Sequence, residues 1–169
     1  KLGAAFNFCE KVTGVLVEGG RVKGVKTDKA EYSAPVVVNA AGAWAKPVAR
    51  MAGLDVPVTP DSHEAAITEP VAPFCHSMVV DLRPVKGSRN YYFYQNRHGQ
   101  VVFCITPDPP FIGEDYRETS AFLPQVCSRM VQLLPRLRIL RLRRVWRGLY
   151  PMTADGSPLL GWNREVKGL

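Results

Sequence analysis

The chain has 169 residues, 46% of them hydrophobic, which is enough to bury roughly 70% of the unfolded surface in one well-packed domain. No apolar run approaches the roughly 18 residues that a membrane-spanning helix needs. The four cysteines form no CxxC pair and the three histidines are dispersed, which argues against a zinc site and a disulfide framework. We therefore expect a soluble, cytoplasmic protein without a metal, whose thiols are reduced and mostly buried.

The formal net charge of +7 has much of its excess in one segment. Six arginines between residues 136 and 147 are interleaved with apolar residues, a pattern typical of a half-buried strand with a charged solvent face. Clustered cations also bind nucleic acids, but no RNA-binding motif accompanies them. We expect a solvated sheet face or a subunit contact here, and no nucleic-acid partner.

The first third of the chain predicts a hairpin, a buried strand and a short helix. Residues 12–17 and 21–27 form the hairpin, because the two glycines between them can supply the positive φ angles of a tight turn. Residues 34–39 form an unbroken apolar run, the pattern of a strand covered on both faces in a parallel sheet. Small residues follow this run, and residues 44–52 indicate a short helix.

The rest of the chain predicts mostly strands and one longer helix. The expected strands are residues 63–69, 78–82, 90–95, 100–106 and 138–149, the third and fourth forming a hairpin. Residues 119–134 place Phe122, Val126 and Met130 on one helix face. The order of elements indicates an α+β fold with a largely antiparallel sheet and flanking helices.

Two motifs carry most of the functional information. Residues 36–44 read Val-Val-Val-Asn-Ala-Ala-Gly-Ala-Trp, and residues 145–161 run from an aromatic strand into a Thr/Asp/Gly/Pro turn and an apolar pair. In this order and spacing, the motifs resemble the D-amino-acid oxidase superfamily of FAD-dependent amine oxidoreductases, which includes glycine oxidase, sarcosine oxidase and dimethylglycine dehydrogenase. The resemblance covers nearly the whole chain.

The resemblance implies a division of the chain into three parts. Residues 1–60 would be a remnant of the FAD-binding domain, residues 61–150 the substrate-binding domain, and residues 151–169 a return segment toward the FAD-binding domain. No GxGxxG fingerprint precedes the first hairpin. We therefore expect a fragment that lacks the N-terminal Rossmann half and does not retain FAD by itself.

The resemblance also implies the residues of the site. Val12 would face the adenine of FAD, and Ala41 and Gly42 would face the dinucleotide; from the residues alone, tight strand-to-helix packing explains the small residues equally well. Tyr92 matches a substrate-facing tyrosine of the sarcosine oxidases. Because side chains alternate along a strand, Tyr91 and Phe93 are expected in the core instead.

Tyr150 is the second expected catalytic residue, and it sharpens the resemblance. Glycine oxidase and D-amino-acid oxidase relatives often carry an arginine there that pairs with the substrate carboxylate, whereas a tyrosine is similar to sarcosine oxidases and dimethylglycine dehydrogenases. Monomeric sarcosine oxidase tethers FAD through a cysteine at the position of Gly148, so any FAD would be held noncovalently at this point. Arg147 lies on the strand face opposite Tyr150, which leaves the carboxylate partner unassigned.

Two other polar residues receive structural interpretations. His63 is expected to be a surface or core histidine. Glu64 matches a family strand beneath the active site, where no base is needed if the amine arrives neutral.

Together these features imply that the parent protein oxidises a secondary or tertiary amino acid, such as sarcosine, another N-alkyl glycine or a proline-like compound, by hydride transfer to FAD. The alternative is a noncatalytic subunit or interaction module that retains the fold. The expected partners are a small-molecule amine and a second subunit or electron acceptor.

Overall fold

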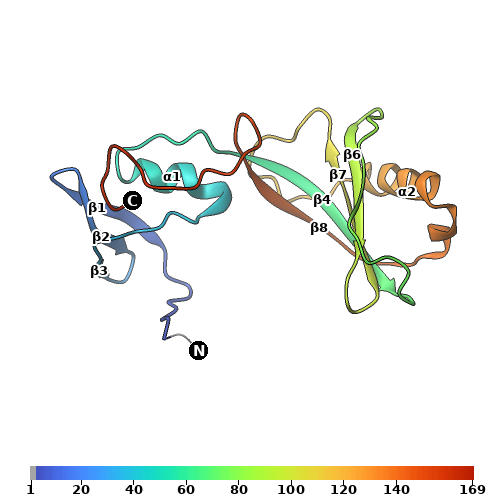
Figure 1. Ribbon diagram of the computed structural model, residues 1–169, viewed down its shortest axis with the longest axis horizontal. Helices are drawn as coiled ribbons and strands as arrows, with labels where there is room; N and C mark the ends of the chain where they lie inside the picture. Colours follow the sequence, from blue (N-terminus) through green and yellow to red (C-terminus); the bar gives the residue numbers. More distant parts are fainter. Residues whose placement is uncertain (1–2) are drawn as a thin grey trace. The chain divides into compact units, whose positions relative to one another are not determined.

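The computed structural model describes residues 3–169; Lys1 and Leu2, at the start of the expected 1–60 region, lie outside the described residues. The chain forms two compact units, one of residues 60–150 and one made of the segment ending at Thr59 together with residues 151–169 (Figure 1). The sheets are mostly antiparallel and the helices few, so the expected fold class is confirmed. No helix in the described part of the chain is long and apolar enough to cross a membrane.

The first unit contains a three-stranded antiparallel sheet and one short helix. Its elements are β1 (Val12–Glu18), β2 (Arg21–Thr27), β3 (Glu31–Ser33), the 3-10 helix η1 (Gly42–Trp44) and α1 (Ala45–Arg50). Gly19 and Gly20 have φ angles of 56° and 72°, as the predicted β1–β2 turn requires. The C-terminal segment returns to this unit, since the Lys167 backbone bonds to Gly20 and Val22, and Val166 joins the core.

Residues 34–39 correct the sequence analysis, because they form no strand. Val36 is 46% exposed and Val38 80% exposed, whereas a strand in the interior of a parallel sheet is covered on both faces. The backbone N–H of Val37 donates to the carbonyl of Gly168 at 2.8 Å, but no strand of the described residues pairs along this segment. An apolar run becomes a covered strand only where neighbouring strands are available to it.

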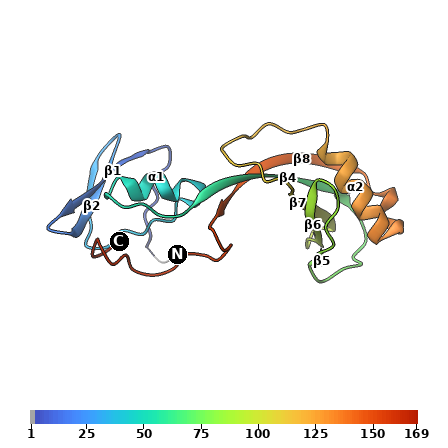
Figure 2. The same ribbon diagram turned by 90° about the horizontal axis from the view of Figure 1, so that it is seen from above.

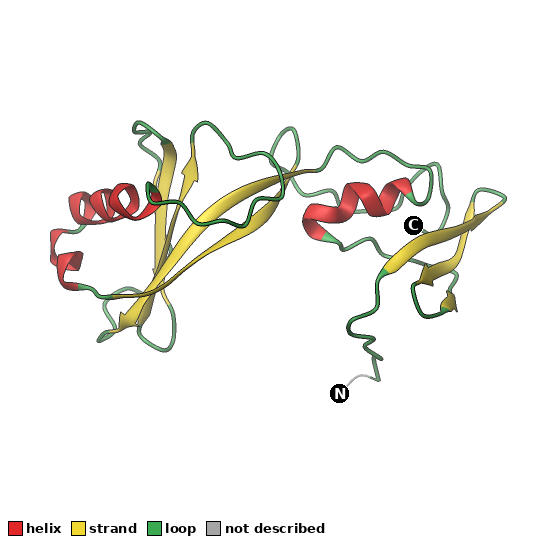
Figure 3. Cartoon of the chain, turned by 180° about the vertical axis from the view of Figure 1, so that it is seen from behind, coloured by secondary structure: helices red, strands yellow, loops and turns green. Residues whose placement is uncertain are grey.

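The second unit is built on a five-stranded sheet with the order β5-β6-β7-β4-β8. Its elements are β4 (Thr59–Pro70), β5 (Val79–Asp81), β6 (Ser88–Gln95), β7 (Gln100–Pro107), α2 (Phe122–Leu133), the 3-10 helix η2 (Pro135–Ile139) and β8 (Leu142–Met152). The predicted β6–β7 hairpin and the α2 helix are confirmed. The segment between β7 and α2 contains no regular strand or helix (Figure 3).

The two faces of this sheet differ in what covers them. The register aligns Phe93, Phe103 and Ala66 in one row, and these residues form a core with the buried side of α2. Figure 2 shows α2 beside the strands of this sheet. The adjacent row aligns Tyr92, Cys104 and Ala65 on the opposite face. We call these the helix face and the tyrosine face.

The final strand, β8, lies later in the chain than the predicted residues 138–149, because it begins at Leu142 and ends at Met152. Residues 135–139 form η2, and β8 begins only at Leu142. Pro135 at the start of η2 has a fixed φ and no N–H to donate, which suits the first turn of a helix rather than a strand ladder. The apolar and basic alternation of this segment therefore misplaced the start of the strand.

Candidate functional site

Tyr92 and Tyr150 meet on the tyrosine face. Their hydroxyl oxygens lie 2.7 Å apart, although Tyr92 belongs to β6 and Tyr150 to β8, with β7 and β4 between these strands. Tyr150 is 43% exposed. The structure thus brings together the two residues that sequence analysis placed in the substrate site, and leaves their hydroxyls at an accessible surface.

A buried carboxylate and imidazole lie beside this pair. Asp61 and His63 are two residues apart on β4, and Asp61 Oδ2 lies 3.0 Å from His63 Nε2. The His63 ring packs on the Tyr150 ring, with centroids 4.4 Å apart. His63 Nδ1 and Asp61 Oδ1 are buried and have no hydrogen-bond partner. From the sequence, His63 was expected to be a surface or core residue, and Asp61 was not among the expected site residues.

The tyrosine face keeps its hydroxyl and thiol groups neutral. Burial raises the pKa of Tyr92, and the neighbouring Cys104 thiol and Tyr150 hydroxyl raise it further. Burial also raises the pKa of Cys104 to about 11. Around neutral pH both groups therefore keep their protons and can act as hydrogen-bond donors.

The four cysteines are free in the structure. Only Cys104 is buried, however, whereas Cys9 is exposed and Cys75 and Cys127 are partly buried. The expectation of mostly buried thiols was therefore wrong. Apolar neighbours in sequence do not guarantee burial when the residue lies in a loop, as Cys9 does.

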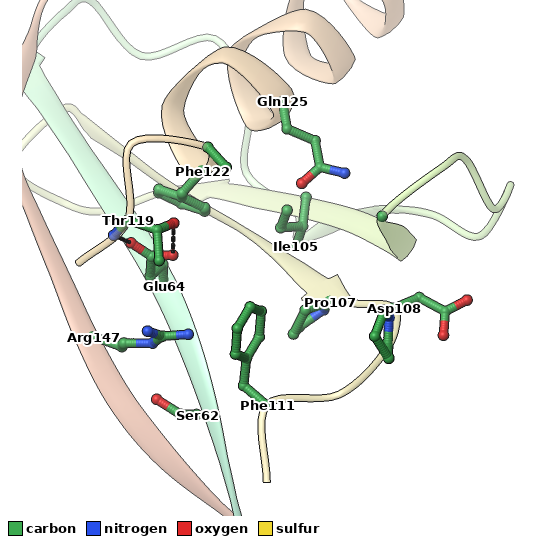
Figure 4. Close-up of a pocket in the computed structure, with 13 residues that line it drawn as sticks. Ser62, Glu64, Ile105, Pro107, Asp108, Phe111, Thr119, Phe122, Gln125 and Arg147 are labelled. Carbon is green, nitrogen blue, oxygen red and sulfur yellow. Dashed lines mark hydrogen bonds between the residues drawn. The ribbon is translucent and has the colours of Figure 1, made fainter. Parts of the chain in front are cut away.

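The helix face contains a cavity of about 210 Å³ that includes polar residues of β4 and β8 (Figure 4). Glu64 lies in it, buried, and accepts hydrogen bonds from the backbone N–H of Thr119 at 2.6 Å and its hydroxyl at 2.7 Å. These contacts tie the loop before α2 to the sheet. The position of Glu64 opposite the tyrosine face follows from its being one residue after His63.

Arg147 lies in the same cavity and corrects the sequence analysis. It was expected on a solvated sheet face or at a subunit contact, but it is only 8% exposed within this chain. Its guanidinium lies 4.6 Å from the centre of the Phe111 ring, and Nη1 donates to the carbonyl of Arg117 at 2.6 Å. The loop between β7 and α2 supplies both partners and covers the arginine, which strand periodicity cannot predict.

The expected cofactor-binding residues lie in the other unit. Gly42 has a φ of 58° and no atom within 4 Å of where a Cβ would stand. The backbone N–H of Ala41 donates to Asn39 Oδ1, and Asn39 Nδ2 donates to the carbonyl of Ala45, so the Asn39 side chain holds this turn. Val12 begins β1 and is partly buried. An open, glycine-containing turn fits the close approach of a dinucleotide.

Comparisons with known proteins identify the family of the chain. The family described as FAD dependent oxidoreductase matches residues 1–169. Hydrogen cyanide synthase subunit HcnC of Pseudomonas protegens is 31% identical over 168 residues, which are 98% of this chain and 38% of that protein. Glycine oxidase of Pseudomonas putida is 30% identical over 151 residues, which are 89% of this chain and 39% of that protein.

A solved structure supports the same relationship. L-proline dehydrogenase from P. horikoshii has a TM-score of 0.80 and 32% identity, and the match covers 94% of this chain and 42% of that chain. The chain therefore spans only 38% to 42% of the length of these three proteins. The expected resemblance is confirmed, and the chain belongs to the FAD-dependent oxidoreductase family.

Proposed function

We propose that this chain is part of a flavoprotein that oxidises a secondary or tertiary amino acid, with the substrate held at the tyrosine face. The observation that carries the proposal is the Tyr92–Tyr150 hydroxyl pair, 2.7 Å apart on an open sheet face beside the buried Asp61–His63 pair. Cavities and faces that combine apolar surface with a few fixed polar groups are typical of small-molecule sites.

FAD is the cofactor that the family implies, and when bound it accepts the hydride from the carbon next to the amine nitrogen. In this proposal Val12, Ala41 and Gly42 contribute to its binding, as parts of an FAD-binding domain made of residues 1–60 and the return segment 151–169. The open space beside Gly42 supports this assignment. Gly148, in place of a tethering cysteine, supports noncovalent binding at that point.

The chain's own contribution is to orient the substrate. Two tyrosine hydroxyls share two protons, and the bond between them uses one, so the second O–H is available to donate, either to the neighbouring Cys104 sulfur or to a substrate. A carboxylate or the amine nitrogen of an amino acid can accept that bond. The His63 ring holds Tyr150 from one side and Asp61 fixes the imidazole, so the hydroxyl pair is positioned before substrate arrives.

The names of the relatives support an N-alkyl amino acid as the substrate class. L-proline dehydrogenase from P. horikoshii and sarcosine oxidase subunit beta of Rhizobium meliloti are 32% and 31% identical to this chain, respectively. Both names specify a secondary amino acid. We propose sarcosine, another N-alkyl glycine or a proline-like compound for this protein.

A noncatalytic role is the second candidate. Two relatives, HcnC and sarcosine oxidase subunit beta, are named as subunits. This protein is therefore also a candidate subunit of a multi-protein complex. In the catalytic proposal the partner is a second subunit or an electron acceptor. In the noncatalytic alternative the fold serves only as an interaction module, and no amine reduces a bound flavin.

The test is Tyr150→Phe in the full-length protein, with sarcosine and L-proline as substrates and flavin bleaching as readout. We expect kcat/KM to fall about tenfold or more, because the substrate loses a fixed hydrogen bond worth about 1.5 kcal/mol. The control is Tyr94→Phe, a partly exposed tyrosine on the same side of β6. Unchanged kinetics in Tyr150→Phe contradict the site, and no bleaching with any amine in the native protein supports the noncatalytic alternative.

A further inference from the structure

The cavity on the helix face is separate from the proposed substrate site. Side chains alternate along β4, so Ser62 and Glu64 line the cavity while Asp61 and His63 lie beside Tyr150. All residues that line the cavity belong to residues 60–150. This cavity is therefore formed within one unit.

Arg147 has unused hydrogen-bonding capacity in this cavity. Its guanidinium donates one hydrogen bond, from Nη1 to the Arg117 carbonyl, and Nε is buried without any acceptor. Arg147 takes part in none of the ion pairs between described residues. A buried donor without an acceptor costs about 1–3 kcal/mol, and a guanidinium edge formed by Nε and Nη2 matches a carboxylate in bidentate geometry.

The neighbouring acids have other hydrogen-bond partners. The pKa of Asp115 is lowered mainly by its hydrogen bonds from Arg117 and also by the nearby charge of Arg147, but its carboxylate accepts from Arg117. Each oxygen of Glu64 accepts a hydrogen bond from Thr119, and none of the ion pairs between described residues joins Glu64 to Arg147. Figure 4 shows the Arg147 guanidinium pointing toward the Phe111 ring on the side of the cavity. The other walls are apolar and include Ile105 and Phe122.

We propose that this cavity binds a small carboxylate with a compact apolar body, with the carboxylate on Arg147 and the apolar body against Ile105, Phe111 and Phe122. A cavity of about 210 Å³ suits a molecule the size of a small amino acid or a five-membered-ring acid. If the ligand is an amino acid, its ammonium faces Glu64, whose remaining lone pairs can accept it. If it carries no amine, Arg147 alone provides the recognition.

The experiment is an NMR titration of the 169-residue chain that follows the Arg147 Nε–H signal, assigned by its absence in Arg147→Lys, together with the backbone amide signals of Thr119 and Gln125 in the cavity lining, which report binding in every variant. The probes are L-proline, cyclopentanecarboxylate, which lacks the amine, and pyrrolidine, which lacks the carboxylate. We expect saturable shifts with one or both carboxylates and none with pyrrolidine. Binding of both probes identifies a carboxylate site, whereas binding of L-proline alone identifies an amino-acid site that also uses Glu64.

Variants separate this cavity from the tyrosine face. Arg147→Lys keeps the charge but loses the planar edge, and we expect at least tenfold weaker binding, whereas Arg144→Lys, an exposed arginine on the same strand, leaves it unchanged. Ala121→Trp places a bulky group at the cavity from an exposed position and should also abolish binding. Tyr150→Phe should leave binding unchanged. The proposal is overturned if neither carboxylate shifts the signal, or if Ala121→Trp binds them as tightly as the native chain.

Discussion

The two faces of the five-stranded sheet use buried polar groups in different ways, although their residues alternate along the same strands. On the helix face, each carboxylate oxygen of Glu64 accepts a hydrogen bond from Thr119 in the loop before α2, and the unpaired buried atom is a donor, Arg147 Nε, at a cavity. On the tyrosine face, Asp61 and His63 are bonded to each other but retain one unpaired atom each, beside the accessible Tyr150. The contrast shows that burial alone does not identify a functional group, whereas buried groups with unused capacity next to an open surface do.

The largest effect is expected when the buried pair on the tyrosine face is broken. His63→Ala leaves the Asp61 carboxylate buried without its partner, and we expect the free energy of unfolding to fall by about 3 kcal/mol. The matched control is His98→Ala in the exposed β6–β7 turn, with a change below about 0.5 kcal/mol. Urea unfolding of the 169-residue chain measures both.

A double-mutant cycle decides whether Asp61 and His63 act as a unit. The double replacement of both by alanine removes the unpaired charge as well, so we expect it to cost less than the sum of the single changes, with a coupling of about 1–3 kcal/mol. If the changes in the free energy of unfolding are strictly additive, the two residues are not energetically coupled, and His63 contributes only through packing.

On the helix face, we expect Glu64→Ala to lower the free energy of unfolding by about 2 kcal/mol. The reason is that two donors of Thr119 lose a charged acceptor at a buried position. Glu69→Ala tests an exposed glutamate at the end of the same strand and should have almost no effect. Thermal unfolding compares the two variants. Equal effects mean that the loop before α2 does not depend on the Glu64 contacts.

The sequence predicted which residues lie on each face wherever the periodicity of a single strand or helix was sufficient. Alternation placed Tyr91 and Phe93 in the core, and both are fully buried, while Tyr92 lies on the other side. Helical spacing likewise placed Phe122 and Val126 on the buried side of α2. Periods of two and 3.6 residues suffice for such predictions.

The features that the sequence did not predict depend on contacts between segments that are distant in the chain. The packing of His63 on Tyr150 needs β4 and β8 to be neighbours, and the burial of Arg147 needs the loop that carries Phe111 to cover it. The prediction of a covered strand at residues 34–39 was wrong for the same reason, since such a strand requires partner strands. The sequence contained one signal for the two polar groups of β4, the Asp-Ser-His-Glu order of residues 61–64. Alternation along a strand places the first and third of these residues on one face and the second and fourth on the other.

The smallest and most discriminating effect is expected at the adjacent tyrosines of β6, one on each face. The Tyr91 hydroxyl is buried without a hydrogen-bond partner, whereas the Tyr92 hydroxyl bonds to Tyr150. Tyr91→Phe removes an unsatisfied polar group, so we expect the free energy of unfolding to rise by up to about 1 kcal/mol. Tyr92→Phe loses a hydrogen bond, so we expect the free energy of unfolding to fall by about 1 kcal/mol.

The pH dependence of Tyr91→Phe checks the physical reason. Burial raises the pKa of Tyr91 in the folded chain, while an unfolded tyrosine ionises near about 10. The stability due to the neutral buried phenol is therefore complete below about pH 10 and is lost as the pH rises above it, because the unfolded chain releases its proton first. Phenylalanine has no proton to release, so the advantage of Tyr91→Phe should widen above about pH 10. An advantage that stays constant from pH 7 to about pH 11 shows that Tyr91 ionises as freely in the folded chain as in the unfolded one, and that the helix face does not exclude water from its hydroxyl.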